Sequence, residues 1–210
     1  MNDRRLRIVK LGGSLLDLSD LADRVHDWLS QQKPANNFFI AGGGTIVESL
    51  RELCAHQRID DSTAHELAMR AMSLTARILA DRLGCRVLSL HPSEITSQKP
   101  FDELAVLDVY QTICERDPHS TACDLPQSWD VTSDSIAAWM ARQSGCQELV
   151  LLKSALPSPG CQTWQEVADS AYVDAHFPVV ASAVAEVRSV NLRDQAFAEW
   201  TPGQTSTTGV

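Results

Sequence analysis

The sequence has little positive charge: 18 of its 210 residues are lysine or arginine and 27 are aspartate or glutamate, which gives a formal net charge of −9. Proteins that bind nucleic acid usually carry a basic surface, so we expect no nucleic-acid partner. Apolar runs are short, as in residues 149–152, whereas a membrane-spanning helix needs about 20 apolar residues. No apolar stretch typical of a signal peptide follows Met1. We therefore expect a cytoplasmic protein without a membrane segment.

Paired cysteines are also lacking. The six cysteines never form a C-x-x-C pair, and they are Cys54, Cys85, Cys114, Cys123, Cys146 and Cys161. A chain of this length can build a core without disulfides, so we expect reduced and mostly structural thiols. No group of histidine, cysteine and aspartate has the spacing of metal ligands, and we predict no metal site made by the protein itself.

Apolar runs alternate with amphipathic segments along the chain. The runs that indicate strands are residues 6–11, 37–41, 86–90, 104–107, 148–153 and 186–191. The segments with helical periodicity are residues 18–32, 45–56, 62–83, 109–115, 132–143, 164–170 and a stretch after Pro178. Such alternation predicts an α/β fold, a three-layer αβα sandwich with a mainly parallel open sheet. We expect a single domain over residues 1–200 and a disordered tail over 201–210.

Two glycine clusters follow predicted strands: Gly12-Gly13 before Ser14, and residues 42–44 before the second helix. Backbone N–H groups at such a turn can face an anion, and residues without Cβ let a substrate approach the backbone. The alternatives are a tight turn for the first cluster and a flexible connector for the second. The spacing matches neither a P-loop, because Lys10 precedes the glycines, nor a G-x-G-x-x-G motif, and no G-x-S-x-G elbow is present.

Two of the four lysines occupy equivalent positions on predicted apolar strands: Lys10 lies between Val9 and Leu11, and Lys153 ends its strand. A buried ammonium costs several kcal/mol unless an anion meets it, and a phosphate would do so. A surface lysine on an edge strand is the alternative for Lys10. Asp134 opens the helix before the Lys153 strand, where it could hold an ammonium or simply cap the helix. His65 and His91 could contact substrate or be structural.

These motifs resemble the amino acid kinase superfamily, which includes acetylglutamate, uridylate, aspartate and isopentenyl phosphate kinases. The resemblance rests on four segments in the family's order, residues 9–14 (VKLGGS), 41–44 (AGGG), 132–138 (TSDSIAA) and 151–153 (LLK). Within the family, the small size and residues 129–135 (WDVTSDS) are similar to the methanofuran-biosynthesis kinase. That kinase phosphorylates an aminomethyl-furanmethyl phosphate.

The resemblance implies an acceptor-binding half at about residues 1–130 and a shortened nucleotide-binding half at about 131–200. It implies that Lys10 contacts the transferring phosphoryl group, that Lys153 contacts the leaving phosphate, and that Asp134 orients both lysines. The nucleotide is expected against Gly12, Gly13, Ser14, Ser133 and Ser154, with Gly12 and Gly13 donating N–H groups to its phosphates. The acceptor is expected against Gly42, Gly43, Gly44, His65 and Thr132. The implied cofactors are ATP and Mg²⁺, the metal being carried chiefly by the nucleotide.

We therefore predict an ATP-dependent kinase whose acceptor is a phosphate monoester or a carboxylate, including uridylate, acetylglutamate and isopentenyl phosphate among the alternatives. Many relatives continue after Lys153 with Thr-Asp-x-x-Gly-Val, whereas this chain reads SALPSPG over residues 154–160. A non-catalytic nucleotide-binding regulator on the same fold is therefore the main rival, and a Rossmann-type oxidoreductase is a weaker one. We expect residues 93–127 to shape the acceptor pocket and the helix at 62–83 to form the interface of a homodimer or higher homo-oligomer.

Overall fold

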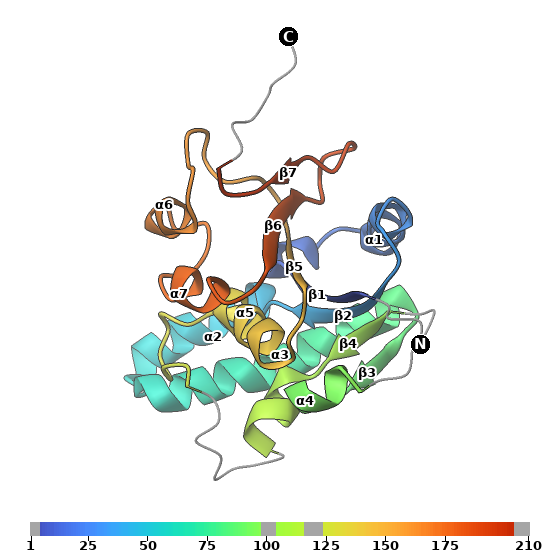
Figure 1. Ribbon diagram of the computed structural model, residues 1–210. Helices are drawn as coiled ribbons and strands as arrows, with labels where there is room; N and C mark the ends of the chain where they lie inside the picture. Colours follow the sequence, from blue (N-terminus) through green and yellow to red (C-terminus); the bar gives the residue numbers. More distant parts are fainter. Residues whose placement is uncertain (1–4, 98–103, 116–123, 204–210) are drawn as a thin grey trace.

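The computed structural model describes residues 5–97, 104–115 and 124–203, which contain a seven-stranded sheet (Figure 1). The strand order is β3-β4-β2-β1-β5-β6-β7. The parallel strands are β1 (Arg5–Leu11), β2 (Ala35–Ala41), β3 (Arg86–Leu88), β4 (Ala105–Leu107), β5 (Glu148–Lys153) and β6 (Glu186–Asn191). The last strand, β7 (Glu199–Trp200), pairs antiparallel with β6. The predicted α/β class with a mainly parallel sheet is thus confirmed.

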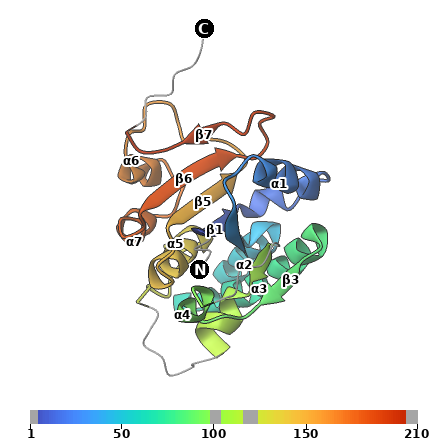
Figure 2. The ribbon, with the colours of Figure 1, turned by 45° about the vertical axis from the view of Figure 1, so that its right-hand side comes forward.

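Helices lie on both faces of this sheet (Figure 2). They are α1 (Leu21–Ser30), α2 (Gly44–Gln57), α3 (Asp61–Leu83), α4 (Pro92–Ile95), α5 (Ser133–Gln143), α6 (Trp164–Asp169) and α7 (Phe177–Ala181). The predicted helix at 109–115 is instead mainly a π-helical turn at Gln111–Glu115. The sequence did not indicate α4, β7 or the 3₁₀ turn at Gly13–Leu15, because each is too short to show a period.

The alternation of side chains along β1 and β5 assigns residues to the two faces. Ile8 and Leu149 pack in the core under α5, whereas Val9 and Val150 pack in the core under α1. Side chains two residues apart share a face of a strand, so Lys10 lies on the α5 side with Ile8. Since β1 pairs with both β2 and β5, the edge-strand alternative for Lys10 is wrong.

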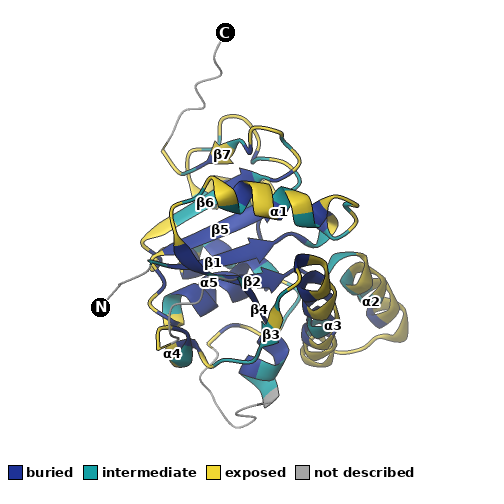
Figure 3. Ribbon diagram, turned by 90° about the vertical axis from the view of Figure 1, so that its right-hand side faces the viewer, coloured by how far each residue is buried: buried dark blue, intermediate teal, exposed yellow. Residues whose placement is uncertain are grey.

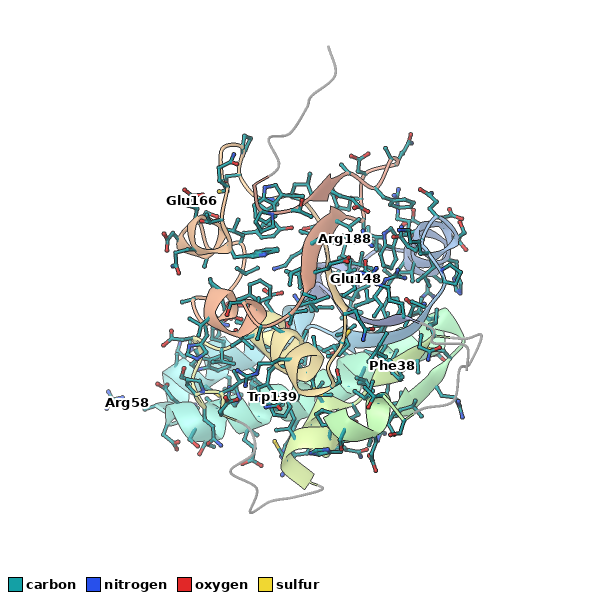
Figure 4. The ribbon with its side chains drawn as sticks, in the orientation of Figure 1. Phe38, Arg58, Trp139, Glu148, Glu166 and Arg188 are labelled. Atoms are coloured by element: carbon teal, nitrogen blue, oxygen red, sulfur yellow. The ribbon has the colours of Figure 1, made fainter. Side chains whose placement is uncertain are left out.

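Buried charges also lie at the amino-terminal ends of β1 and β5, the ends opposite Lys10 and Lys153. The Glu148 carboxylate accepts from Arg7 Nε at 2.7 Å and lies 2.9 Å from an Arg188 guanidinium nitrogen. Figure 4 shows Glu148 and Arg188 together on β5 and β6. Both arginines lie near the ring of Trp28, at 6.0 and 5.7 Å. This network joins three neighbouring strands to α1.

Figure 3 shows exposed residues on α1, α2 and α3, and six of the seven large hydrophobic side chains exposed among the described residues lie on α2 and α3 or between them. Among the described residues, no helix combines the length and apolarity needed to cross a membrane. Cys54, Cys146 and Cys161 are free thiols, and Cys123 lies outside the described residues. Residues 204–210 of the predicted tail also lie outside them, so its disorder stays a prediction.

Candidate active site

Three charged side chains meet at the carboxyl ends of β1 and β5. Lys10 Nζ lies 2.8 Å from Asp134 Oδ1, and Lys153 Nζ donates to Asp134 Oδ2 at 2.8 Å. Lys10 and Asp134 are each 4% exposed. The register explains the meeting, because Lys10 pairs with Leu151, two residues before Lys153 on the same face. Asp134 therefore contacts both lysines, as the resemblance implies.

The charges in this cluster depend on one another. Burial would raise the pKa of Asp134, but the two ammonium groups outweigh it and lower that pKa to about 2. Burial lowers the pKa of Lys153, with Lys10 acting in the same direction and Asp134 opposing it. One carboxylate between two ammonium groups leaves one excess positive charge, which suits a phosphoryl group.

The two lysines differ in how many donors remain available. Lys153 Nζ also donates to the Tyr172 carbonyl at 2.6 Å and lies 4.7 Å from the centre of the Tyr172 ring. Lys10 has only the Asp134 carboxylate as partner among residues 5–97, 104–115 and 124–203. An ammonium has three N–H donors, so Lys10 keeps two for a ligand and Lys153 keeps one.

Asp134 is held at the first turn of α5 but does not cap it. Thr132 is the N-cap, and its Oγ1 accepts from the Asp134 N–H at 3.3 Å. The cap interpretation of Asp134 is therefore wrong. Asp174, which the sequence did not indicate, accepts hydrogen bonds from Thr132 and Ser135. No motif surrounds Asp174, so nothing in the sequence pointed to it.

The two glycine turns pack against each other beside this cluster. A Cβ on Gly13 would lie 2.1 Å from the Gly44 nitrogen, and Gly44 has φ +57°, so both positions require glycine. The Gly12 N–H donates to Leu152 O and the Gly42 N–H to Leu11 O, both at 2.8 Å. The expectation that the Gly12 N–H contacts phosphate is therefore wrong. The N–H groups of Gly13 and Gly44 donate to no backbone oxygen within the described chain.

A cavity of about 360 Å³ adjoins the glycine turns. Several predicted site residues line it, namely Gly13, Ser14, Gly43, Gly44, His65, Thr132 and Ser133. Gly12, Gly42, Ser154 and the three charged residues do not, although Ser154 Oγ lies 3.4 Å from Ser14 Oγ. No described residue between 93 and 127 lines the cavity, so that expectation is wrong for the described part of the segment.

Apolar side chains from α2, α3 and the segment before α5 form most of the remaining wall. They are Val47, Ala68, Met69, Met72, Trp129, Val131 and Ile136. Arg51 also lines the cavity, with its guanidinium 4.7 Å from the Trp129 ring centre. Its Nε has no hydrogen-bond partner in the part of the chain that the structure describes. His65 Nδ1 is 3.2 Å from Ser128 O, and burial lowers its pKa. His91, in contrast, caps α4.

Thr45 and two exposed carboxylates, those of Asp17 and Glu48, complete the cavity wall. Asp17 has no ion-pair partner within the described chain. Glu48 has one, Arg51, whose Nε lies 4.0 Å from the Glu48 carboxylate. The described residues contain no group of three or more histidine, cysteine, aspartate or glutamate side chains arranged to hold a metal ion.

Comparison with known proteins gives a family and a fold. The amino acid kinase family model matches residues 5–155, and no curated protein sequence matches the chain. Among solved structures, UMP kinase from Ureaplasma parvum has a TM-score of 0.60 at 14% identity, covering 91% of this chain and 92% of that one. UMP kinase from Bacillus anthracis has a TM-score of 0.59 at 11% identity, covering 91% and 88%. Uridylate kinase from Archaeoglobus fulgidus has a TM-score of 0.57 at 12% identity, covering 88% of each chain.

Proposed function

Because the chain belongs to the amino acid kinase family, we propose that it transfers the γ-phosphoryl group of ATP to a small anionic acceptor. The observation that carries this proposal is the Lys10–Asp134–Lys153 cluster at the carboxyl ends of two central strands. Ligands gather at this edge of parallel sheets. Phosphoryl transfer needs alignment and stabilisation of charge more than covalent help from the protein.

In this proposal an acceptor oxygen attacks the γ-phosphorus, the bond to the β–γ bridging oxygen breaks, and ADP leaves. The two unpaired N–H donors of Lys10 suit the equatorial oxygens of the moving group, and the remaining donor of Lys153 suits the leaving phosphate. Mg²⁺ would arrive with the nucleotide and neutralise its phosphates. Asp134 acts by holding both ammonium groups in place.

The chemistry of Asp134 supports an acceptor that is already ionised. A carboxylate locked between two ammonium groups, with a pKa of about 2, is a poor base for removing the proton of an alcohol. A phosphate monoester or a carboxylate carries its own negative charge and needs no such base. These two groups are therefore the acceptors that we propose.

The cavity supports a narrower proposal, the aminomethyl-furanmethyl phosphate of methanofuran-type cofactor biosynthesis. Its flat apolar ring suits the wall that includes Met69, Met72 and Ile136, and its ammonium suits Asp17 and Glu48 at the cavity edge. Its phosphate would meet the glycine turns. Uridine monophosphate, the substrate named for the similar structures, would place a polar base against the same apolar wall.

An assay of ADP release tests this proposal. The protein, ATP and Mg²⁺ are mixed with single acceptors from a panel of uridine monophosphate, isopentenyl phosphate, N-acetylglutamate and aminomethyl-furanmethyl phosphate. We expect ADP formation with an anionic acceptor, strongest for the aminomethyl-furanmethyl compound. If ATP raises the melting temperature but no acceptor yields ADP, the kinase proposal fails and the non-catalytic nucleotide-binding role replaces it.

A further inference from the structure

The turn between α6 and α7, residues 171–174, contacts both ends of the charged cluster. Ala171 opens it in the left-handed region, with φ 59°, an uncommon conformation for a residue other than glycine. The turn then presents Tyr172 to Lys153 and Asp174 to the first turn of α5. No sequence motif marks this segment, and the proposed phosphoryl transfer assigns it no role.

Asp174 accepts six hydrogen bonds. Its Oδ2 accepts from Thr132 N at 3.0 Å, Thr132 Oγ1 at 2.7 Å and Ser135 N at 3.1 Å. Its Oδ1 accepts from Ser135 Oγ, and from His176 N and Phe177 N at 3.1 Å each. Two backbone N–H donors face each oxygen. The side-chain amide of an asparagine at position 174 would therefore point its NH₂ group at two N–H donors in either orientation. The site requires a carboxylate.

This carboxylate is linked to Asp134 through one side chain. Thr132 Oγ1 donates to Asp174 and accepts from the Asp134 N–H. The negative charge also lies at the N-terminal end of α5, where the helix dipole favours it. Asp174 therefore sets the position of the helix turn that carries Asp134.

Tyr172 holds the other side of the cluster. Its carbonyl and ring both contact the Lys153 ammonium, at 2.6 and 4.7 Å. Its hydroxyl donates to Ala155 O at 2.8 Å and contacts Ser189 Oγ on β6. The ring is thus anchored at two points behind the lysine.

We propose that Asp174 and Tyr172 are positioning residues that fix Asp134 and Lys153 for phosphoryl transfer, an inference that rests on the proposed function. The charged groups that face the Lys153 ammonium are Asp134 on α5, Lys10 on β1 and Asp174 on this turn. Asp174 favours the ammonium form of Lys153, so removing its charge lowers the pKa of Lys153. Because this effect acts through space, the change in the Lys153 pKa reports the electrostatic contact, and a fall in kcat reports the positioning.

The test compares Asp174→Asn with Glu166→Gln, which weakens a cap of the same kind on α6. Glu166, labelled in Figure 4, lies on α6 and accepts from the N–H groups of Gln162 and Thr163, the two residues before that helix. We expect both variants to lower the melting temperature. Only Asp174→Asn should lower kcat, roughly 10-fold to 100-fold as for a misplaced catalytic group, and move the alkaline limb of the pH–rate profile to lower pH. An unchanged kcat and pH profile in a folded Asp174→Asn protein would overturn the proposal.

A measurement that needs no turnover separates this proposal from the kinase proposal. The chain has only four lysines, so ¹³C-lysine NMR gives four side-chain signals, and Lys153→Arg assigns the one of interest. We expect the Lys153 signal to titrate at lower pH in Asp174→Asn and also in Tyr172→Leu. The second variant keeps the Asp174 contacts to α5, so it tests the proposal even if Asp174→Asn does not fold. Unchanged Lys153 titration in Tyr172→Leu and in any folded Asp174→Asn would contradict positioning. A shift without any kinase activity would refute only the proposed function.

Discussion

Lys10 illustrates how a charge is held inside an apolar sheet. It is 4% exposed on the central strand β1, and the Asp134 carboxylate 2.8 Å away compensates its burial. The sequence indicated that an anion must meet this lysine and suggested phosphate. The structure supplies a protein carboxylate first, which keeps the ammonium in place before any nucleotide binds and leaves two of its donors for the ligand.

Removing that carboxylate should destabilise the fold as well as stop catalysis. In Asp134→Asn, Lys10 and Lys153 lose their shared anion while remaining buried, and breaking a buried ion pair in this way costs roughly 3 kcal/mol. Urea unfolding at neutral pH measures this difference from wild type. An equal free energy of unfolding in the two proteins would show that the ammonium groups do not depend on Asp134.

The same pair of proteins gives a pH test. The pKa of Asp134 is lowered from 3.8 to about 2, because the two ammonium groups outweigh the effect of burial. A group whose pKa is lower in the folded state stabilises the fold above its unfolded pKa and loses that contribution as pH falls through the folded pKa. The stability gap between wild type and Asp134→Asn should therefore shrink as pH falls from about 4 towards 2, and a constant gap would contradict this assignment.

The residues found from sequence and the residues missed differ in a physical way. Lys10 and Lys153 were visible because a charge interrupts an apolar run, a local pattern. Asp174 and Arg51 act through contacts with segments distant in the chain, Asp174 with α5 and Arg51 with the Trp129 ring. A single sequence without a local pattern does not record such contacts.

At the scale of elements, the glycine turns allow the end of β1 and the start of α2 to approach closely. The Gly13 backbone lies so near Gly44 that a Cβ would fall 2.1 Å from the Gly44 nitrogen. We expect Gly13→Ala to push the two turns apart, lower the melting temperature and abolish activity, because Gly13 and Gly44 line the cavity and the neighbouring Gly12 lies against Lys153. The change is measured by thermal unfolding and ADP release.

Gly84→Ala is the matched control for that substitution. Gly84 ends α3 with φ +64° and has open space around it, so the added methyl meets no atom within 4 Å. Its cost is limited to left-handed strain of about 1–2 kcal/mol, with activity retained. If Gly13→Ala behaves like Gly84→Ala, the close approach of the two turns is not what requires glycine at position 13.

The long periodic elements could be predicted from sequence, and the short ones could not. The predicted strands at 148–153 and 186–191 match β5 and β6 residue for residue, since apolar runs bounded by turn signals define them. The two-residue strand β7 exists because Ser189 and Val190 offer pairing partners to a returning chain, which is tertiary context. The shape of the cavity was hidden for the same reason, because α2, α3 and the segment before α5 jointly form it.

At the scale of the whole molecule, net charge and local charge differ in sign. The chain carries −9, yet the Lys10–Asp134–Lys153 cluster has one excess positive charge, enough for one nucleotide and too little for a polyanion.

The α2–α3 pair exposes Leu53 at 56% and Leu74 at 54%, and the homodimer expected through α3 stays a prediction.

One measurement tests the central claim most directly, ³¹P NMR of ATP, Mg²⁺ and the acceptor panel with wild type and with Lys10→Ala. With wild type we predict that the γ-phosphorus signal of ATP is lost as signals of ADP and of a diphosphate or acyl phosphate appear. With Lys10→Ala the same product should form roughly 10²–10⁴ times more slowly, because a positioned charge has been removed. Equal rates for the two proteins, or no new phosphorus signal with any acceptor, would contradict the account.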